Sequence, residues 1–397
     1  KSLTVSGITA SSKTYDGSVT ATMDGTSAVY SGLVSGDTFN GSYTGAFSNA
    51  NVGTGKTVTI TSSYTGADVN NYSVTNQSST TADISTKALT ATASVSNKTY
   101  DATNSATATL TLSGLVGSET LGSTNTSTFN NKNVGSNKTV TVNSITLADG
   151  SNGGLAANYS ISAGQTTTAN ITAKSLTVSG ITASNKAYDG NSVASLDVSS
   201  VAYSGLVSGD TFNGTYTGAF SNKNVGVGKT VTITPSYNGA DVSNYSITNH
   251  ADVTANITAK ALTVSGVRAS DKTYDGSVTA TMNGNSAVYS GFVPGDDFVA
   301  SYSGVFANAN AGTGKTVTIT SSYNGADVSN YNITDQTSTT ANISAKALTA
   351  TASASNKVYD GSSAATSNLT LSGFVGSETV TSTNSSTFNN KNAGTGK

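Results

Sequence analysis

Cysteine and tryptophan are absent from this 397-residue chain, histidine occurs once and proline twice. Without cysteine, neither disulfide bonds nor thiolate metal sites can stabilise the fold. The single histidine, His250, cannot support a histidine-based triad or a multi-histidine metal site. Because the serine and threonine hydroxyls then have no base to activate them, we expect no enzyme: no catalytic residue, no cofactor-binding residue, no metal ligand and no cofactor.

Charge and long apolar runs are also scarce. Charged residues make up 10% of the chain and the net charge is −2, so the basic surface of a nucleic-acid-binding protein is missing. No apolar run approaches membrane-spanning length, and we recognise no signal peptide. We therefore expect no nucleic-acid partner and no membrane-spanning segment.

The residues that are abundant favour strands and turns. Glycine occurs 41 times and tyrosine 18 times, and threonine, valine and isoleucine are frequent, whereas strong helix formers such as glutamate and methionine are rare. Hydrophobic residues make up only 35% of the chain, which predicts a thin core. Composition thus predicts an all-β fold with many turns.

An internal repeat organises the chain. A lysine, one intervening residue and Tyr-Asp recur at Tyr15, Tyr100, Tyr188, Tyr274 and Tyr359, and a further lysine opens each copy. The predicted domains are therefore five β repeats, the fifth of them partial, covering residues 1–86, 87–173, 174–259, 260–345 and 346–397.

The repeats are of more than one kind. The opening lysine lies 55 residues before a second lysine, Lys56, in repeat one and 51 residues before Lys138 in repeat two. Repeats three and four share the first spacing and repeat five the second, so repeats two and five form a variant subtype. Repeat four resembles repeat one most, which indicates a larger period of three repeats.

Apolar and hydroxyl side chains alternate within each repeat, as in Leu3-Thr4-Val5, Val58-Thr59-Ile60 and Ala82-Asp83-Ile84. Such strands, separated by glycine turns, predict antiparallel β-sandwich-like domains of about six to eight strands. The stretch Ala28–Val34 could instead form a helical turn, and a true helix there would make the domain β-grasp-like. No flexible linker separates Ile84 from Leu89, so we expect a semi-rigid, elongated rod.

Gly53-Thr54-Gly55-Lys56-Thr57 resembles part of a phosphate-binding loop. The full motif needs a glycine where Ala50 stands and a helix afterwards, but a strand pattern follows. We interpret this stretch as a glycine hairpin.

Two further sites are open alternatives. Asp16 and Asp68 recur together and could contribute to a calcium site assembled across loops, although capping of turns by their side chains is the favoured interpretation. Lys13, Asn51 and Asp16 would permit an intramolecular isopeptide crosslink.

The tyrosines and threonines allow a binding surface or a plain structural role. Tyr30, Tyr43 and Tyr64 could stack on sugars, but we favour the thin core for them. Thr57, Thr59 and Thr61 could form a flat binding ladder, but we favour the solvated face of a sheet.

Lys-x-Tyr-Asp-Gly, then Ser35-Gly36-Asp37, Asn51 to Val58, Gly66-Ala67-Asp68 with Asn71-Tyr72, and Thr81 to Ile84 together resemble the YDG repeat of filamentous-haemagglutinin-like bacterial surface adhesins. The resemblance covers the whole chain and departs from the motif at Ala102 and at an insertion over 149–154. It implies an extracellular, cell-surface location in a large secreted adhesin. It identifies no binding residue.

The resemblance implies a non-catalytic stalk, with adhesion to a host or environmental surface or glycan residing outside this segment. One alternative is a self-assembling subunit of an extracellular filament or sheath, in which polar faces and strand edges of several chains pair. Another is a module that itself binds glycans or a surface.

For the Tyr-Asp-Gly motif, the sequence predicts a tyrosine that anchors the core and an aspartate that caps the following turn. Because Ala102 replaces the glycine in repeat two, we expect an ordinary turn without a positive φ at the third position.

Overall fold

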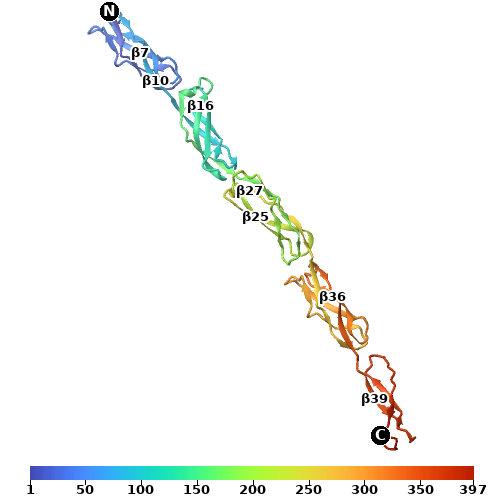
Figure 1. Ribbon diagram of the computed structural model, residues 1–397. Helices are drawn as coiled ribbons and strands as arrows, with labels where there is room; N and C mark the ends of the chain where they lie inside the picture. The colour runs from blue at the N-terminus through green and yellow to red at the C-terminus, as the bar shows by residue number, and fades with distance from the viewer. The chain divides into compact units, whose positions relative to one another are not determined.

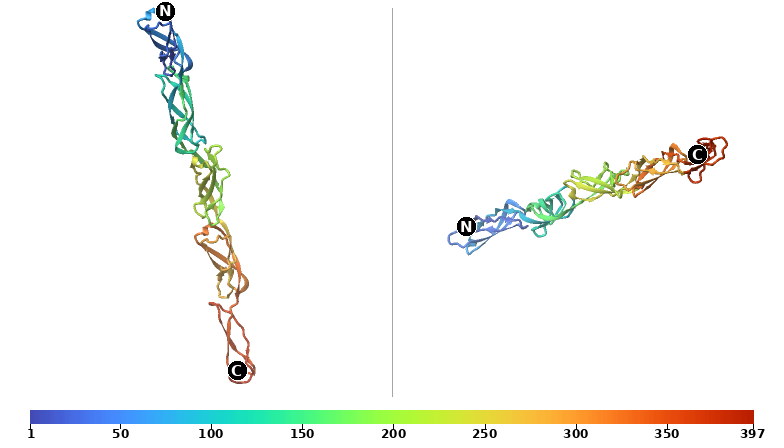
Figure 2. Two further views of the ribbon diagram at one scale, coloured as in Figure 1. Left: turned by 90° about the vertical axis from the view of Figure 1, so that its left-hand side faces the viewer. Right: turned by 90° about the horizontal axis from the view of Figure 1, so that it is seen from below.

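The computed structural model describes all 397 residues, and strands make up most of its regular structure (Figure 1). Both views in Figure 2 likewise show strands and loops along the chain. The chain contains no α-helix, only four 3₁₀ helices of three residues each. The predicted all-β fold in tandem repeats is confirmed. Ala28–Val34 contains strand β6 (Val29–Ser31), so the β-grasp-like alternative, which needs a helix, is wrong.

Repeat one contains ten strands and one 3₁₀ helix, more than expected because several strands are only two residues long. They are β1 (Ser2–Ser6), β2 (Thr9–Ala10), β3 (Lys13–Thr14), β4 (Thr20–Ala21), β5 (Met23–Asp24), β6, β7 (Asn40–Phe47), β8 (Gly53–Thr65), η1 (Val69–Asn71), β9 (Ser73–Thr75) and β10 (Ser79–Ser85).

These strands form two main sheets. The three-stranded sheet has the order β6-β1-β9 and the five-stranded sheet the order β3-β10-β8-β7-β4. Strand β1 runs parallel to β9, and β10 runs parallel to β3. The sheets are thus mixed, where the sequence pattern predicted antiparallel ones, because alternation reports which face of a strand is buried and not the direction of its neighbour.

The alternation predicted from the sequence decides which side chains form the core. In β8, Val58 and Ile60 are buried while Thr57, Thr59 and Thr61 are exposed. The threonine ladder is therefore a solvated sheet face, as favoured.

Repeat one has two core clusters. One cluster, with Leu3, Val5 and Ile8 at its centre, lies beneath the three-stranded sheet. The other includes Phe47 and Ile84 of the five-stranded sheet, and it continues into repeat two.

Repeats two, three and four also have one three-stranded and one five-stranded sheet, whereas repeat five has two two-stranded sheets. Repeat two contains β11 (Lys87–Val95), β12 (Lys98–Thr99), β13 (Ser105–Ala106), β14 (Ala108–Ser113), β15 (Leu121–Phe129), β16 (Gly135–Asp149), η2 (Ala156–Asn158), β17 (Tyr159–Ile161) and β18 (Thr166–Thr172). Repeat three contains β19 (Lys174–Ser179), β20 (Thr182–Ala183), β21 (Lys186–Ala187), β22 (Val193–Ala194), β23 (Leu196–Asp197), β24 (Ala202–Ser204), β25 (Asn213–Phe220), β26 (Gly226–Asn238), η3 (Val242–Asn244), β27 (Tyr245–Thr248) and β28 (Val253–Thr258).

Repeat four contains β29 (Lys260–Ser265), β30 (Arg268–Ala269), β31 (Lys272–Thr273), β32 (Thr279–Ala280), β33 (Met282–Asn283), β34 (Val288–Ser290), β35 (Val299–Phe306), β36 (Gly312–Asn324), η4 (Val328–Asn330), β37 (Tyr331–Thr334) and β38 (Ser338–Ser344). Repeat five contains β39 (Thr349–Ala354), β40 (Ala364–Ala365), β41 (Ser367–Ser372) and β42 (Ser386–Thr387).

By its contacts the chain divides into two compact units, and the division passes through repeat three. The first unit comprises Lys1–Ser179, Ala202–Gly214 and Tyr237–Asn249, and the second comprises Gly180–Val201, Thr215–Ser236 and His250–Lys397. Each place where one repeat meets the next, called a joint below, therefore lies inside one compact unit.

Candidate functional site

The Tyr-Asp-Gly motif is a turn held closed by the lysine that precedes it. Asp16 Oδ1 accepts hydrogen bonds from the backbone N–H of Ser18 at 2.9 Å and from Lys13 Nζ at 2.7 Å. Lys13 Nζ also donates to the backbone oxygens of Ser18 and Thr20. The predicted capping role of the aspartate is confirmed. The sequence did not suggest that the lysine also closes the turn, by binding the aspartate and two backbone oxygens.

The same lysine lies over an aromatic ring in every repeat. Lys13 Nζ is 5.4 Å from the centre of the Phe47 ring, within reach of a cation–π interaction. The equivalent pairs are Lys98 with Phe129, Lys186 with Phe220, Lys272 with Phe306, and Lys357 with Phe388. The lysine and aspartate of the motif and this phenylalanine thus form one cluster in each repeat.

The third position of the motif adopts a left-handed backbone, so the expectation of an ordinary turn is wrong. Gly17 has φ +76°, and Ala102, which replaces it in repeat two, has φ 63°. A side chain added at Gly17 would also come within 2.9 Å of Val116 in the next repeat. Glycine therefore suits this position for its backbone and for close packing across the joint.

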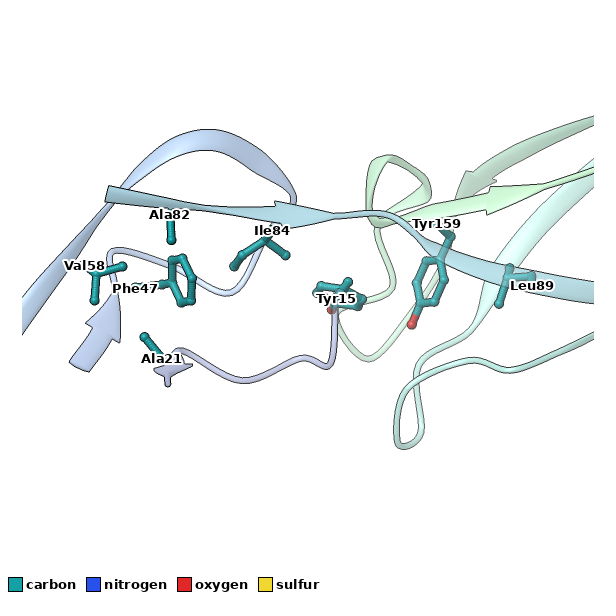
Figure 3. Packing of buried hydrophobic residues seen from close by; sticks show 8 residues of the cluster. All are labelled: Tyr15, Ala21, Phe47, Val58, Ala82, Ile84, Leu89 and Tyr159. Carbon is teal, nitrogen blue, oxygen red and sulfur yellow. The ribbon is translucent and has the colours of Figure 1, made fainter. Parts of the chain in front are cut away.

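The tyrosine of the motif anchors the core, as predicted, and it also reaches across the joint. The Tyr15 ring is buried and lies 5.3 Å from the Tyr159 ring of repeat two in an edge-to-face arrangement (Figure 3). The Tyr15 hydroxyl donates to Glu119 Oε1 and the Tyr159 hydroxyl donates to Glu119 Oε2, both at 2.6 Å. One carboxylate thereby joins a tyrosine from each repeat.

The same clamp of tyrosine, acid and tyrosine forms at the next two joints. At the second joint Asp210 accepts from Tyr100 and Tyr245, and at the third joint Asp296 accepts from Tyr188 and Tyr331. At the fourth joint Tyr274 donates to Glu378. Every Tyr-Asp-Gly motif that is followed by another repeat is therefore a contact between repeats.

A buried asparagine makes a second contact at three joints. Asn158, which ends the 3₁₀ helix η2, is 1% exposed, and its Oδ1 accepts the backbone N–H of Val52 in repeat one at 2.9 Å. Asn244 accepts in the same way from Val134, and Asn330 from Val225. A buried N–H with no acceptor would be costly, so this contact fixes how the repeats meet.

The hydrophobic core is continuous through the first joint (Figure 3). Tyr15, Phe47 and Ile84 of repeat one belong to the same buried cluster as Leu89 and Tyr159 of repeat two. Strand β10 leads into β11 through the single residue Thr86. At the third joint, Tyr188 and Phe220 likewise share a cluster with Leu262 and Tyr331.

Two joints carry an additional ion pair. Lys132 Nζ lies 3.1 Å from Asp241 and 3.5 Å from Asp210, and Lys223 Nζ lies 2.9 Å from Asp327 and 3.2 Å from Asp296. The hydrogen bond to Asp241 is the main cause that raises the pKa of Lys132. The Lys223 ammonium is the main cause that lowers the pKa of Asp327.

Burial and the acidic partners together keep the joint tyrosines protonated. Burial, followed by the hydrogen bond to Glu119, raises the pKa of Tyr15 to about 12. Burial, followed by the hydrogen bond to Asp296, raises the pKa of Tyr188 to about 12. The clamp therefore needs the neutral hydroxyl as its donor.

The Gly-Lys-Thr stretch is not a hairpin. Gly53–Thr65 is one strand, β8, with a register shift against β10 and a left-handed Gly55 of φ 57°. The backbone N–H of Gly55 donates to Asp83 at 2.7 Å. The interpretation as a glycine hairpin is wrong, because this stretch is a β-bulge at the start of a long strand.

The structure does not bring together the residues of the two alternative sites. Asp16 is bound to Lys13, whereas Asp68 accepts the backbone N–H of Thr38 beside the other core cluster. Lys13 Nζ makes its hydrogen bonds to Asp16, Ser18 and Thr20. Asn51 Oδ1 accepts instead from Asn158 of the next repeat. No group of three or more histidine, aspartate and glutamate side chains is arranged to hold a metal ion.

The candidate sugar-stacking tyrosines belong to the core, as favoured. Tyr30, Tyr43 and Tyr64 are partly buried against the first core cluster, and the hydroxyls of Tyr30 and Tyr43 are 2.8 Å apart. His250 lies in a loop, where its Nδ1 is 2.6 Å from the backbone oxygen of Ala251. The structure also contains no helix with the length and apolar character needed to cross a membrane.

Sequence reasoning missed the joint contacts. Glu119 is 104 residues from Tyr15, and Asn158 is 106 residues from Val52. The signal that could have found them is the recurrence of an acid after a Ser-Gly, Pro-Gly or Gly-Ser step, and of Asn-Tyr later in each complete repeat.

These features define a tandem array of all-β domains with built contacts between successive repeats. The chain belongs to the YDG domain family, whose model matches residues 1–82, 85–169, 172–255, 258–340 and 344–397. The predicted YDG repeat array is thereby confirmed, and such repeats suggest a structural or binding protein.

The other comparisons add little. No match was found among curated proteins. Among solved structures, the crystal structure of Drosophila N-cadherin EC1-4 is similar at 9% identity and a TM-score of 0.21, over 84% of this chain and 90% of that chain. A likeness this weak carries no argument.

Proposed function

We propose that this chain is a non-catalytic stalk or spacer region of a large secreted bacterial adhesin at the cell surface. The observation that carries the proposal is the joint between repeats. At the first joint, repeats one and two share a hydrophobic core, and Glu119 and Asn158 of repeat two bind Tyr15 and Val52 of repeat one. A spacer needs joints that resist bending, and buried contacts of this kind supply that resistance.

The sheet edges of repeat one also support a stalk that does not associate sideways. The edge strands β3 and β4 of its five-stranded sheet are two residues long, and β6 and β9 of the three-stranded sheet are three residues long. Short edge strands are a common protection against pairing between chains.

A self-assembling filament is the second candidate, favoured by one observation. In repeat two the edge strand β14 (Ala108–Ser113) of the three-stranded sheet has six residues. An edge of this length offers more backbone groups to a strand from another chain.

Small-angle scattering and sedimentation of the 397-residue chain over a concentration series distinguish the candidates. A stalk predicts an extended particle whose mass and maximum dimension do not change with concentration. Growth into longer particles would favour the filament. A stalk also predicts no specific hits on a glycan array, and reproducible hits would favour a glycan-binding module instead.

A further inference from the structure

The joints are of two chemical types, distinguished by one position on the first repeat of each pair. This position follows Phe-x-Asn. It is lysine at the second and third joints, Lys132 and Lys223, and alanine at the first and fourth joints, Ala50 and Ala309.

The acids that face this position differ in the same way. Each lysine faces two aspartates of the next repeat, Asp210 with Asp241 or Asp296 with Asp327. Where alanine is present, the next repeat carries a glutamate instead, Glu119 or Glu378. In repeat two, Leu155 stands before the 3₁₀ helix at the place that Asp241 occupies in repeat three.

Burial and charge explain why the lysine occurs opposite an aspartate pair and the alanine opposite a glutamate. At the third joint the side chain of Asp296 is 3% exposed and that of Asp327 is 11% exposed, so two carboxylates are withdrawn from water together. Such a pair needs a nearby cation, which Lys223 supplies. At the first joint a single carboxylate, Glu119, has each of its oxygens bound by a tyrosine hydroxyl.

We propose that these residues form a pairing code, so that the N-terminal end of a YDG repeat is a docking surface specific for one type of preceding repeat. An aspartate-pair end accepts a repeat with the lysine, and a glutamate end accepts a repeat with alanine. This inference does not depend on the proposed stalk function, because a filament would use the same surfaces.

The code also assigns a partner to the N-terminal end of repeat one. Asp37 Oδ2 accepts from Tyr72 and Asp68 Oδ2 accepts from Thr38 at 2.9 Å, which are the bonds that Asp210 makes with Tyr245 and Asp241 with Thr211 in repeat three. The aspartate pair of repeat one therefore makes the same hydrogen bonds within its repeat as the pair of repeat three. Its matching partner is a YDG repeat of the lysine type.

A double-mutant cycle in the full chain tests the code at the third joint. Hydrogen exchange of the segment 325–334 is measured in Lys223→Ala, Asp327→Asn and the double variant. We expect Lys223→Ala to speed exchange about tenfold, because two buried carboxylates lose their cation. The double variant should regain part of the protection that Lys223→Ala loses. If the effects of the two single substitutions on the exchange rate were fully additive, the code would be wrong.

Two matched variants address specificity. Lys391→Ala removes the exposed equivalent lysine of repeat five and should change no exchange rate. Ala50→Lys adds a lysine at the first joint, where Glu119 is the only acid of the clamp, and should not slow exchange there. Slower exchange at the first joint in Ala50→Lys would show that any joint accepts the lysine, and the code would be wrong.

The docking surface of repeat one is tested by adding a repeat in front of the full chain. Residues 174–259 placed directly before Lys1 should slow exchange of segment 66–75 about tenfold. The same addition carrying Lys223→Ala, or an added copy of residues 1–86, should protect that segment clearly less. Equal protection by all three additions would overturn the assignment.

Discussion

The tyrosine of the Tyr-Asp-Gly motif has two environments at once. Its ring packs in the hydrophobic core of its own repeat, and its hydroxyl donates to an acid of the next repeat, as Tyr15 does to Glu119. Removing the hydroxyl should therefore weaken the joint while leaving the core of the repeat filled.

Tyr15→Phe should destabilise the first joint by about 1–2 kcal/mol at pH 7, since a hydrogen bond to a charged acceptor is lost. The pKa of Tyr15 is raised from 10.0 to about 12 in the folded chain. A raised pKa means that the stabilisation is complete below pH 10 and disappears as the pH rises towards 12. The difference in joint stability between the parent chain and Tyr15→Phe should therefore disappear as the pH rises from 10 to 12.

Two measurements at several pH values give this difference in stability between the parent chain and Tyr15→Phe. They are urea unfolding of the chain and hydrogen exchange of segment 156–161. Tyr359→Phe is the control, because the equivalent tyrosine of repeat five is 60% exposed and should contribute nothing. A difference that stays constant from pH 9 to 12 would contradict the clamp.

At the third position of the motif, two opposite substitutions should have opposite effects on stability. Ala102→Gly should stabilise repeat two by about 0.5–1 kcal/mol, because Ala102 has φ 63°, where an L side chain is strained. Gly17→Ala should destabilise the first joint by more, since its Cβ would also press against Val116. Thermal unfolding of both variants checks the two signs, and a stabilising Gly17→Ala would contradict the proposed close packing.

Among the elements, the 3₁₀ helix matters more than its three residues suggest. It places Asn330 at the joint, where Oδ1 accepts the N–H of Val225 and Nδ2 donates to Asn224. Asn330→Ala leaves that N–H unpaired and should cost about 1–3 kcal/mol at the third joint. Asn332→Ala, two residues later and exposed, is the matched control for hydrogen exchange of segment 222–228. Equal effects of the two variants would contradict the role of Asn330.

The strands were predictable from sequence where burial alone decides the pattern. Alternation placed Val58 and Ile60 inside and their threonine neighbours outside, as the structure has them. It could not reveal that β10 pairs in parallel with β3, because strand direction depends on how distant segments meet. Nor could it reveal that Gly55 bends a continuous strand, since glycine marks bulges and hairpins alike.

For the whole molecule, the sequence repeat and the packing unit differ. The two compact units divide inside repeat three, while each joint lies within one of them. The sequence predicted the repeats from recurring motifs, but it could not show that packing continues from one repeat into the next. Leu89 and Tyr159 share a core with Phe47 only because the chain crosses the joint without a linker.

Deleting whole repeats should therefore have unequal effects. Removal of residues 174–259 brings Lys132 to Asp296 and Asp327, a matched joint, and should leave local stability near that of the parent. Removal of residues 87–173 brings Ala50 to Asp210 and Asp241 and should destabilise the new joint by about 2 kcal/mol, because two buried carboxylates lack a cation. Hydrogen exchange at each new joint measures the difference.

Ala50→Lys in the second deletion supplies the control. It should restore protection at the new joint, whereas it should give none in the undeleted chain. If both deletions were equally stable, the lysine would have no part in the choice of neighbour.

The lysine-or-alanine position also bears on how such a gene could change in length. Unequal recombination between similar repeats adds or removes blocks of coding sequence. A block of three repeats, such as residues 1–259, can be duplicated so that Lys223 meets Asp37 and Asp68, and every ion pair then finds its partner. Duplication of residues 1–86 alone would bring Ala50 against Asp37 and Asp68, an alanine against an aspartate pair. The chemistry of a single side chain would then favour length variants in which lysine meets an aspartate pair and alanine meets a glutamate, and addition of this three-repeat block is one of them.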